Sequence, residues 1–153
     1  MGACDFMDQG YGSDPQNAFG LLVEEAQYEN GHGGYTGTIA EKRDFVVIEF
    51  DESLIDLAPL REHLKVARTA LKAIPEGQPA WKGASRIEAT IRRYAGLVEG
   101  PDRFNRLAET YADRLIDASD SRIEDKWGPA GCIELKSDRK GQRLFLFFGV
   151  ASS

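Results

Sequence analysis

The chain has 153 residues, of which 42% are hydrophobic and 29% charged, and its formal net charge at pH 7 is −6. These values are typical of a single globular domain over residues 1–153 and exclude a chain that is disordered throughout. No run approaches the roughly 20 apolar residues of a membrane-spanning helix, and the first residues do not resemble a secretory signal. We therefore expect a cytoplasmic protein without a membrane partner.

The charged residues are unevenly distributed along the chain. Residues 1–56 carry twelve acidic and two basic side chains, whereas residues 57–106 carry five acidic and ten basic ones. The remaining residues, 107–153, carry eight acidic and seven basic side chains. Such segregation either marks a binding surface or places an acidic element beside a basic one in the same fold.

The first third of the chain predicts a strand followed by a helix. Residues 3–12 indicate an extended segment that ends at two glycines. Ser13 or Asp14 can cap a helix that ends at Asn30-Gly31, where both residues tolerate a left-handed backbone. Apolar residues recur at helical spacing within it and predict one buried face. They are Ala18, Phe19, Leu22, Val23 and Ala26.

A strand and a second helix are expected next. Residues 45–50, FVVIEF, are apolar at nearly every position, which predicts a strand in the interior of a sheet. Residues 56–74 predict a helix, and Pro75 and Pro79 are expected to separate it from the following one. The buried stripe of the helix is predicted to comprise Leu60, Leu64, Ala67, Leu71 and Ile74.

Two more helices are expected in the middle of the chain. Residues 86–98 predict a helix, with a capping box formed by Ser85 and Glu88, although the alternation of residue types also allows a strand at residues 86–95. A longer helix is expected to begin after Gly100-Pro101 and to continue to about residue 122.

The end of the chain predicts a β-hairpin. Residues 132–135 and 144–148 form its two strands, and a polar turn at 137–142 connects them. We expect the hairpin to join the 45–50 strand in one small, mostly antiparallel sheet, packed with three to four helices. The predicted fold class is therefore α+β, in a single domain.

The glycine-rich stretch 31–38, GHGGYTGT, is the first candidate site. Its backbone can approach a ligand closely, and its N–H groups can hold an anion. However, it lacks the lysine of a phosphate-binding loop, and it follows a helix and precedes a strand, the reverse of a dinucleotide-binding motif. We interpret it as an irregular connection and leave a binding role open for His32, Gly33, Gly34, Tyr35 and Thr36.

A row of basic residues on the predicted 56–74 helix is the second candidate site. We name it the basic ridge, and it comprises Arg61, Lys65, Arg68 and Lys72. Its spacing of four, three and four places it beside the buried stripe. It can meet nucleic-acid phosphates, an acidic protein or the chain's own acidic first helix. The isoelectric point near 5.0 and the lack of a nucleic-acid-reading motif weigh against nucleic acid.

Patterns typical of catalysis and metal binding are weak. The histidines and cysteines, His32, His63, Cys4 and Cys132, have no metal-ligand spacing, and no G-x-S-x-G motif occurs. We therefore expect no metal and no cofactor, and we regard an enzyme as the less favoured hypothesis. A small enzyme or nucleotide binder that uses His32 remains an alternative.

Two segments carry a resemblance to known proteins. Residues 28–42, YENGHGGYTGTIAEK, and residues 127–152, WGPAGCIELKSDRKGQRLFLFFGVAS, are similar to small uncharacterised proteins of tailed bacteriophages and prophages. The resemblance implies a phage-encoded accessory protein in the cytoplasm of a bacterial host, and it supplies no catalytic residues. We expect stoichiometric binding to a host or defence component. The alternatives are small-molecule or nucleotide binding by the 31–38 loop and nucleic-acid binding by the basic ridge, and the oligomeric state stays open.

Overall fold

The computed structural model describes residues 2–74 and 82–153, which divide into two compact units. Unit 1 comprises Met1–Asp51 and Ala108–Ser153, and unit 2 comprises Glu52–Leu107. The predicted α+β class is confirmed, with four α-helices among the described residues and a mostly antiparallel sheet that includes the C-terminal hairpin. The extent of a single domain over residues 1–153 stays a prediction, and each unit is described by itself.

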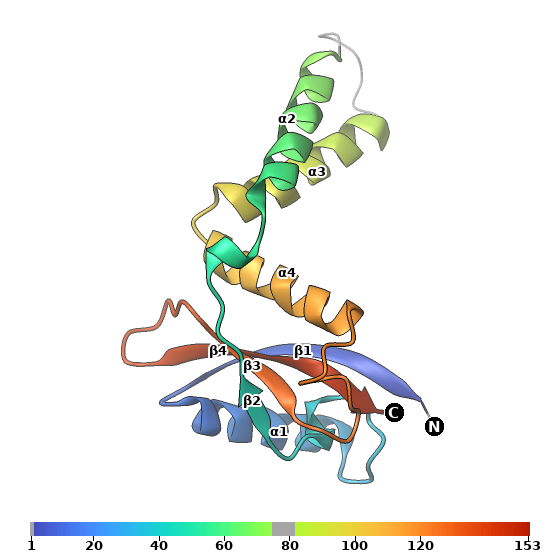
Figure 1. The fold of residues 1–153 in the computed structure, drawn as a ribbon, viewed down its shortest axis with the longest axis vertical. Helices are drawn as coiled ribbons and strands as arrows, with labels where there is room; N and C mark the ends of the chain where they lie inside the picture. Colours follow the sequence, from blue (N-terminus) through green and yellow to red (C-terminus); the bar gives the residue numbers. More distant parts are fainter. Residues whose placement is uncertain (1, 75–81) are drawn as a thin grey trace. The chain divides into compact units, whose positions relative to one another are not determined.

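Unit 1 is built on a four-stranded sheet with the order β1-β4-β3-β2 (Figure 1). β1 (Ala3–Gly12) pairs antiparallel with β4 (Arg143–Ser152) along its whole length. β4 pairs antiparallel with β3 (Ala130–Leu135), and these two strands form the predicted hairpin. β2 (Phe45–Val47) pairs parallel with β3 at the other edge of the sheet.

Helix α1 (Pro15–Asn30) covers one face of the sheet, and its ends agree with the sequence prediction. The Asp14 carboxylate caps the helix by accepting the N–H of Asn17 at 2.7 Å. The helix ends at Gly31, whose φ of 83° is left-handed and whose N–H donates to the carbonyl of Gln27. Both boundaries are therefore set by local backbone chemistry.

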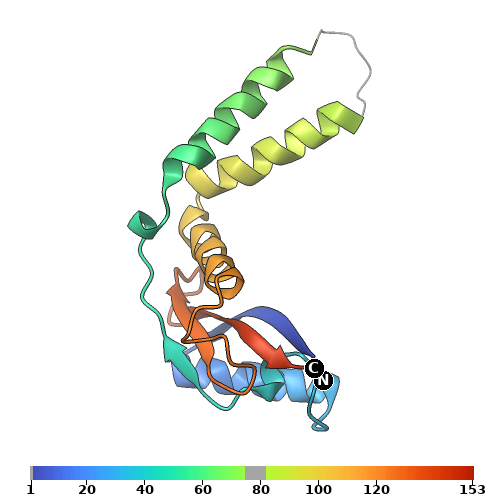
Figure 2. The same ribbon diagram turned by 45° about the vertical axis from the view of Figure 1, so that its right-hand side comes forward.

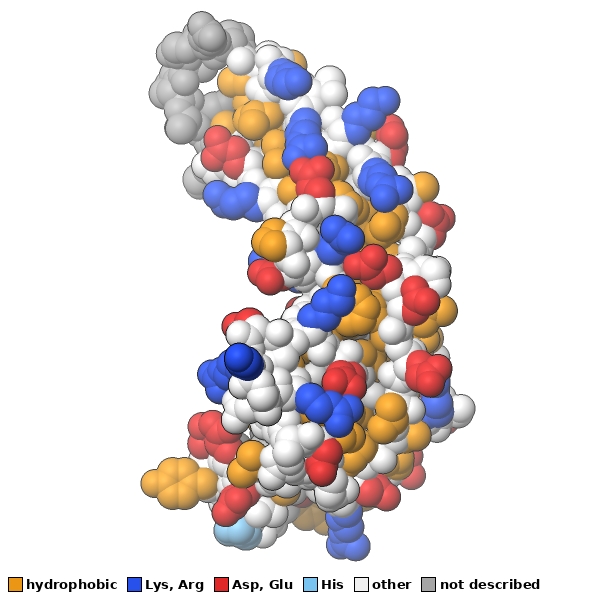
Figure 3. Space-filling model, turned by 90° about the vertical axis from the view of Figure 1, so that its left-hand side faces the viewer, with side chains coloured by type: hydrophobic (Ala, Val, Ile, Leu, Met, Phe, Trp, Pro, Cys, Tyr) orange, Lys and Arg blue, Asp and Glu red, His pale blue; other side chains and the backbone are white. Residues whose placement is uncertain are grey.

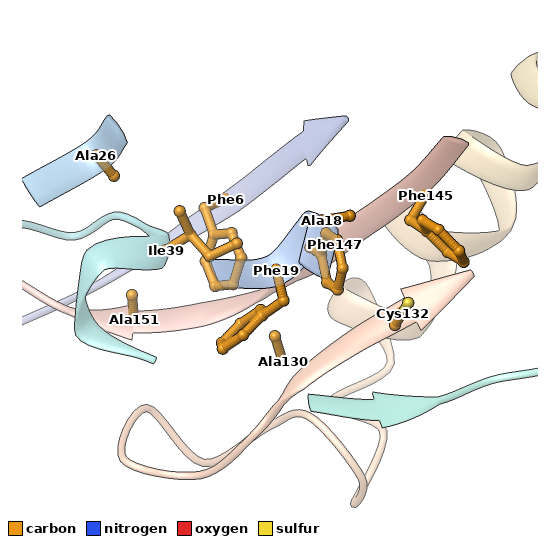
Figure 4. Packing of buried hydrophobic residues seen from close by; sticks show 10 residues of the cluster. All are labelled: Phe6, Ala18, Phe19, Ala26, Ile39, Ala130, Cys132, Phe145, Phe147 and Ala151. Carbon is orange, nitrogen blue, oxygen red and sulfur yellow. The ribbon is translucent and has the colours of Figure 1, made fainter. Parts of the chain in front are cut away.

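Aromatic rings dominate the core between α1 and the sheet (Figure 4). Ring centroids of Phe19 on α1 and Phe147 on β4 are 5.5 Å apart, and Phe19 lies 5.2 Å from Phe45 on β2. The predicted apolar face of α1 thus supplies this core. The buried residues of this core are Phe6, Ala18, Phe19, Ala26, Ile39, Ala130, Cys132, Phe145, Phe147 and Ala151.

The opposite face of the sheet is covered by the second half of α4 (Arg103–Asp117). Ala108 and Ala112 are fully buried there, and their small side chains let the helix pack closely on the strands. The prediction of a helix to about residue 122 is wrong at its end. The helix stops at Asp117, and Ser119 takes a left-handed φ of 51°.

The prediction of an interior strand at residues 45–50 is wrong in length and position, because β2 covers only Phe45–Val47 and lies at an edge. Its apolar sequence has another cause. Phe45 packs into the core on the α1 side, whereas Val46 and Ile48 pack into the core on the α4 side. An edge strand between two helical layers therefore resembles an interior strand in sequence.

Unit 2 contains the helix pair α2 (Leu57–Lys72) and α3 (Lys82–Val98). The two helices run antiparallel, as Figure 2 shows. The short 3₁₀ helix η2 (Glu52–Leu54) precedes them, and the Asp56 carboxylate caps α2 by accepting the N–H of Ala58. The predicted apolar stripe of α2 is buried at Leu60, Leu64 and Ala67.

The start of α3 differs from the sequence prediction. The helix begins at Lys82, so Ser85 lies within its first turn and does not cap it, and the alternative of a strand is wrong. Pro75 and Pro79 lie outside the described residues. Within residues 2–74 and 82–153, no helix is both long enough and apolar enough to cross a membrane.

Candidate functional site

The glycine-rich stretch folds around the carboxylate of Glu41, the last residue of the 3₁₀ helix η1 (Ile39–Glu41). Glu41 Oε1 accepts the N–H of Tyr35 at 3.1 Å. Glu41 Oε2 accepts the N–H of Thr36 at 3.3 Å and its hydroxyl at 2.7 Å. Gly34 and Tyr35 take left-handed φ values of 80° and 58° in this turn. The chain's own carboxylate therefore occupies N–H donors that the sequence suggested for an anionic ligand.

The end of the stretch is fastened to the sheet. Gly37 donates its N–H to the carbonyl of Ser152 at 2.8 Å. Its φ is 70°, and a Cβ placed on it would lie 3.1 Å from the Cβ of Cys4, so this position requires glycine. Thr38 then caps η1, since its Oγ1 accepts the N–H of Ala40. The loop is thus held at both Glu41 and β4.

Lys42 is a buried cation that anchors a second loop. Lys42 is only 3% exposed, and its Nζ donates to three backbone carbonyls. These belong to Asp125 at 3.3 Å, Lys126 at 3.3 Å and Gly128 at 2.9 Å. Burial lowers the pKa of Lys42, and the nearby carboxylates of Asp125 and Asp44 oppose that shift.

The two anchored loops present an exposed aromatic pair, Tyr35 and Trp127. Their ring centroids are 5.9 Å apart at an interplanar angle of 84°, an edge-to-face arrangement. Tyr35 is 49% exposed and Trp127 is 62% exposed. The ammonium of Lys126 lies 5.6 Å from the Trp127 ring centroid. The neighbouring residues Glu41 and Lys42 therefore fix the backbones that carry the two rings.

Sequence reasoning included Tyr35 among its candidates but missed Trp127, Glu41 and Lys42. Tyr35 and Trp127 are far apart in the chain, so their contact depends on tertiary structure. A weak signal was present, because Trp127 stands between a lysine and a glycine in a polar segment, outside any apolar periodicity. Glu41 and Lys42 looked like ordinary surface charges.

The other candidates in the stretch are less constrained. His32 and Gly33 are exposed. Among the residues that the structure describes, no hydrogen bond, ion pair or ring contact involves the His32 side chain. Within this part of the chain, the His32 side chain therefore has no hydrogen-bond partner that would orient it for proton transfer.

The basic ridge lies in unit 2 and is exposed at all four positions, as predicted. Its residues line one hollow of about 380 Å³, together with Leu64, Thr69, Val98 and Glu99. Arg68 forms an ion pair with Glu99. Lys and Arg side chains are visible along the helical part of the chain in Figure 3. The ridge and the glycine-rich stretch belong to different units, so they are separate candidates.

The cysteines offer little support for catalysis. Both are free thiols, Cys4 exposed and Cys132 buried in the core on the α1 side. Burial raises the pKa of Cys132 to about 12, so its thiol stays protonated and a poor nucleophile at neutral pH. Within residues 2–74 and 82–153, no three His, Cys, Asp or Glu side chains gather where they could hold a metal ion.

Comparisons with protein-family models, with curated protein sequences and with solved structures find no match for this chain. The anchored Tyr35–Trp127 pair is the most distinctive part of the geometry of the site.

Proposed function

We propose that this protein acts by stoichiometric binding to a protein partner, and that the Tyr35–Trp127 pair is its main contact surface. The observation that supports this proposal is the exposure of two aromatic side chains on loops anchored by Glu41 and Lys42. Tyr and Trp contribute more than other residue types to binding energy at protein interfaces. Loops that are already ordered also lose little conformational entropy on binding.

The resemblance to phage and prophage proteins supports a cellular context for the proposal. In this context the protein is a phage-encoded accessory protein in the cytoplasm of a bacterial host. Its partner is a host protein or a component of the host's defences, which a small phage protein would inhibit or redirect by occupying a surface.

Affinity capture with matched variants tests the proposal. The tagged protein is incubated with nuclease-treated bacterial lysate, and bound proteins are identified and quantified by mass spectrometry. Tyr35→Ala and Trp127→Ala are compared with Tyr28→Ala, because Tyr28 is 91% exposed but belongs to the surface of α1 and not to the pair. Circular dichroism confirms that each variant is folded.

We expect one dominant partner in fixed stoichiometry with the wild type and with Tyr28→Ala. Loss of one hot-spot ring typically costs about 2 kcal/mol, so Tyr35→Ala and Trp127→Ala should each weaken the complex about 30-fold. Equal capture by all four proteins would contradict the surface assignment. Recovery of the bare protein would contradict the function itself.

A second candidate function is nucleic-acid binding through the basic ridge, favoured by the convergence of Arg61, Lys65, Arg68 and Lys72 on one hollow. Phosphate binding would make the affinity fall steeply as the salt concentration rises. Reversal of Arg61 and Lys65 to glutamate should then abolish binding to a mixed-sequence oligonucleotide. A salt-independent affinity would exclude this mode.

Small-molecule or nucleotide binding by the 31–38 loop is less supported, because Glu41 already occupies donors of that loop. This alternative predicts that a nucleotide raises the melting temperature of the wild type and not that of His32→Ala. No shift with any compound of a nucleotide and metal panel would count against it.

A further inference from the structure

One edge of β1 carries no partner strand in the described part of the chain, since β4 pairs with the other edge. Gly2 and Ser153 exchange two backbone hydrogen bonds, which sets the alternation along the antiparallel pair. The residues whose N–H and C=O groups point away from β4 are then Ala3, Asp5, Met7, Gln9 and Tyr11. A long unpaired edge of this kind can accept another strand.

A groove follows this edge on the side of α1. A hollow of about 470 Å³ is lined by residues 5–9 of β1 and by Leu22, Glu25, Ala26 and Glu29 of α1. A second hollow of about 340 Å³ shares Gln9, Leu22 and Glu25 with the first and continues to Tyr11. The groove therefore accompanies the unpaired edge from residue 5 to residue 11.

Acidic side chains flank the edge on both faces of the sheet. On the α1 side, burial raises the pKa of Asp8, and the charges of Glu25 and Glu29 raise it further. On the α4 side, burial raises the pKa of Asp113, with added effects from Asp117 and Asp5. These carboxylates repel one another, so a cation placed among them would be attracted from both faces.

The surroundings of these carboxylates contain little compensating charge. Among the described residues, none of the six takes part in an ion pair with Lys or Arg. Among the residues that line the two hollows, the one basic side chain is Arg139, which lies at the far end of the groove and stacks on Tyr11 with its guanidinium carbon 3.9 Å from the ring centroid. The hollow along residues 5–9 is thus lined by acidic and not by basic side chains.

We propose that the free edge of β1 binds an extended, basic segment of a partner protein as an added strand. The backbone of the segment would pair with the outward groups of Asp5, Met7 and Gln9, and its Lys or Arg side chains would lie beside the flanking carboxylates. A second copy of this chain is disfavoured, because pairing of two β1 edges would bring the same carboxylates face to face. This site does not depend on the Tyr35–Trp127 surface.

A synthetic peptide serves as the probe. It is an acetylated and amidated heptapeptide of alternating lysine and valine, and it is titrated into the ¹⁵N-labelled full chain while amide exchange with water is followed by NMR. We expect exchange to slow several-fold at the outward amides of Asp5, Met7 and Gln9. The amides of Phe6 and Asp8 already face β4 and should change little.

Two peptide controls separate strand pairing from simple charge attraction. The first is the same heptapeptide with an N-methyl group on every residue, which keeps its charge but removes the backbone N–H donors of both edges. The second replaces every lysine by glutamate. Neither should bind. Equal binding of the N-methylated peptide, or slowed exchange without the alternation, would overturn the added-strand geometry.

Protein variants test the role of the carboxylates. Asp8→Asn and Glu25→Gln should each weaken peptide binding about two- to fivefold, the effect of one exposed charge pair. Glu24→Gln is the matched control, because Glu24 is exposed on α1 but does not line the groove. An equal effect of Glu24→Gln, or no binding of the lysine peptide at about 1 mM, would refute the proposal. Tyr35→Ala should bind the peptide normally, which separates this result from the proposed function.

Discussion

Unit 1 and unit 2 use their charged residues differently. Unit 1 carries eighteen acidic and nine basic side chains, and two of them, Glu41 and Lys42, bind backbone groups and order loops. Unit 2 carries seven acidic and ten basic side chains, and its basic ridge stays on the surface. Charged residues therefore have two different roles in the chain: Glu41 and Lys42 organise a site in unit 1, whereas the basic ridge forms exposed surface in unit 2.

The two units also differ in how they bury apolar residues. In unit 1 the sheet has a core on each face, and several members are fully buried, among them Phe147 and Phe148. In unit 2 the helix pair buries a narrow stripe, in which Leu60 and Ala67 remain 9% exposed. Because burial of apolar surface stabilises a folded unit, we expect unit 1 to be better packed than unit 2.

The largest expected effect tests this packing difference. Phe147→Ala should lower the free energy of unfolding by about 3–5 kcal/mol, because it opens a cavity among Phe19, Phe45 and Phe145. Leu64→Ala in unit 2 should cost about 2–3 kcal/mol, since Leu64 borders an open hollow that can close partly. Native-state hydrogen exchange of β4 and α2 amides measures both, and a larger loss for Leu64→Ala would reverse the comparison.

Removal of the buried cation should have the next largest effect. Lys42→Met keeps the apolar stem but leaves three carbonyls without the ammonium, at a cost of about 2 kcal/mol in stability. The indole N–H signal of Trp127 should also broaden in NMR spectra as its loop loosens. Lys140→Met is the control at an exposed lysine, and an unchanged Trp127 signal in Lys42→Met would show that Lys42 does not order this loop.

Cys132 should make unit 1 sensitive to alkaline pH. The pKa of its thiol is about 12 in the folded state and 9.0 for the free thiol, so the unfolded state loses the proton first as the pH rises. The contribution of the protonated Cys132 thiol to the free energy of unfolding is complete below pH 9.0 and declines as the pH rises towards about 12. At about pH 10.5, deprotonation of this thiol should have lowered the free energy of unfolding of the wild type by about 2 kcal/mol. Cys132→Ala lacks the thiol and should not show this loss. Urea unfolding of both proteins at two pH values checks this, and parallel pH profiles would contradict it.

The smallest expected effect concerns the exposed ion pair of the basic ridge. Arg68→Gln removes the contact with Glu99, in which both side chains are about half exposed, at 46% and 51%. The loss of stability should stay below about 1 kcal/mol and disappear at high salt. Arg61→Gln is the matched control without this ion pair. A larger, salt-independent loss for Arg68→Gln would mean that the ridge also supports the fold of unit 2.

Local elements were predictable from the sequence, whereas contacts between distant segments were not. The Asp14 cap, the Gly31 terminus and the hairpin of β3 and β4 depend on neighbouring residues, and all three predictions are confirmed. The edge position of β2 was missed because helices on both faces of the sheet give its residues the apolar pattern of an interior strand. The turn at Ser119 ended α4 earlier than its apolar periodicity suggested.

By itself, the sequence determined the fold class, most helix and strand positions, the exposure of the basic ridge and the uneven distribution of charge. These properties follow from periodicity, capping and composition, which act over a few residues. Only the tertiary structure brought Tyr35 beside Trp127 and the 31–38 loop around Glu41. In the described part of the chain, it also left one edge of β1 without a partner strand, among carboxylates from two helices. Such arrangements depend on how distant segments pair and pack, which local residue patterns do not specify.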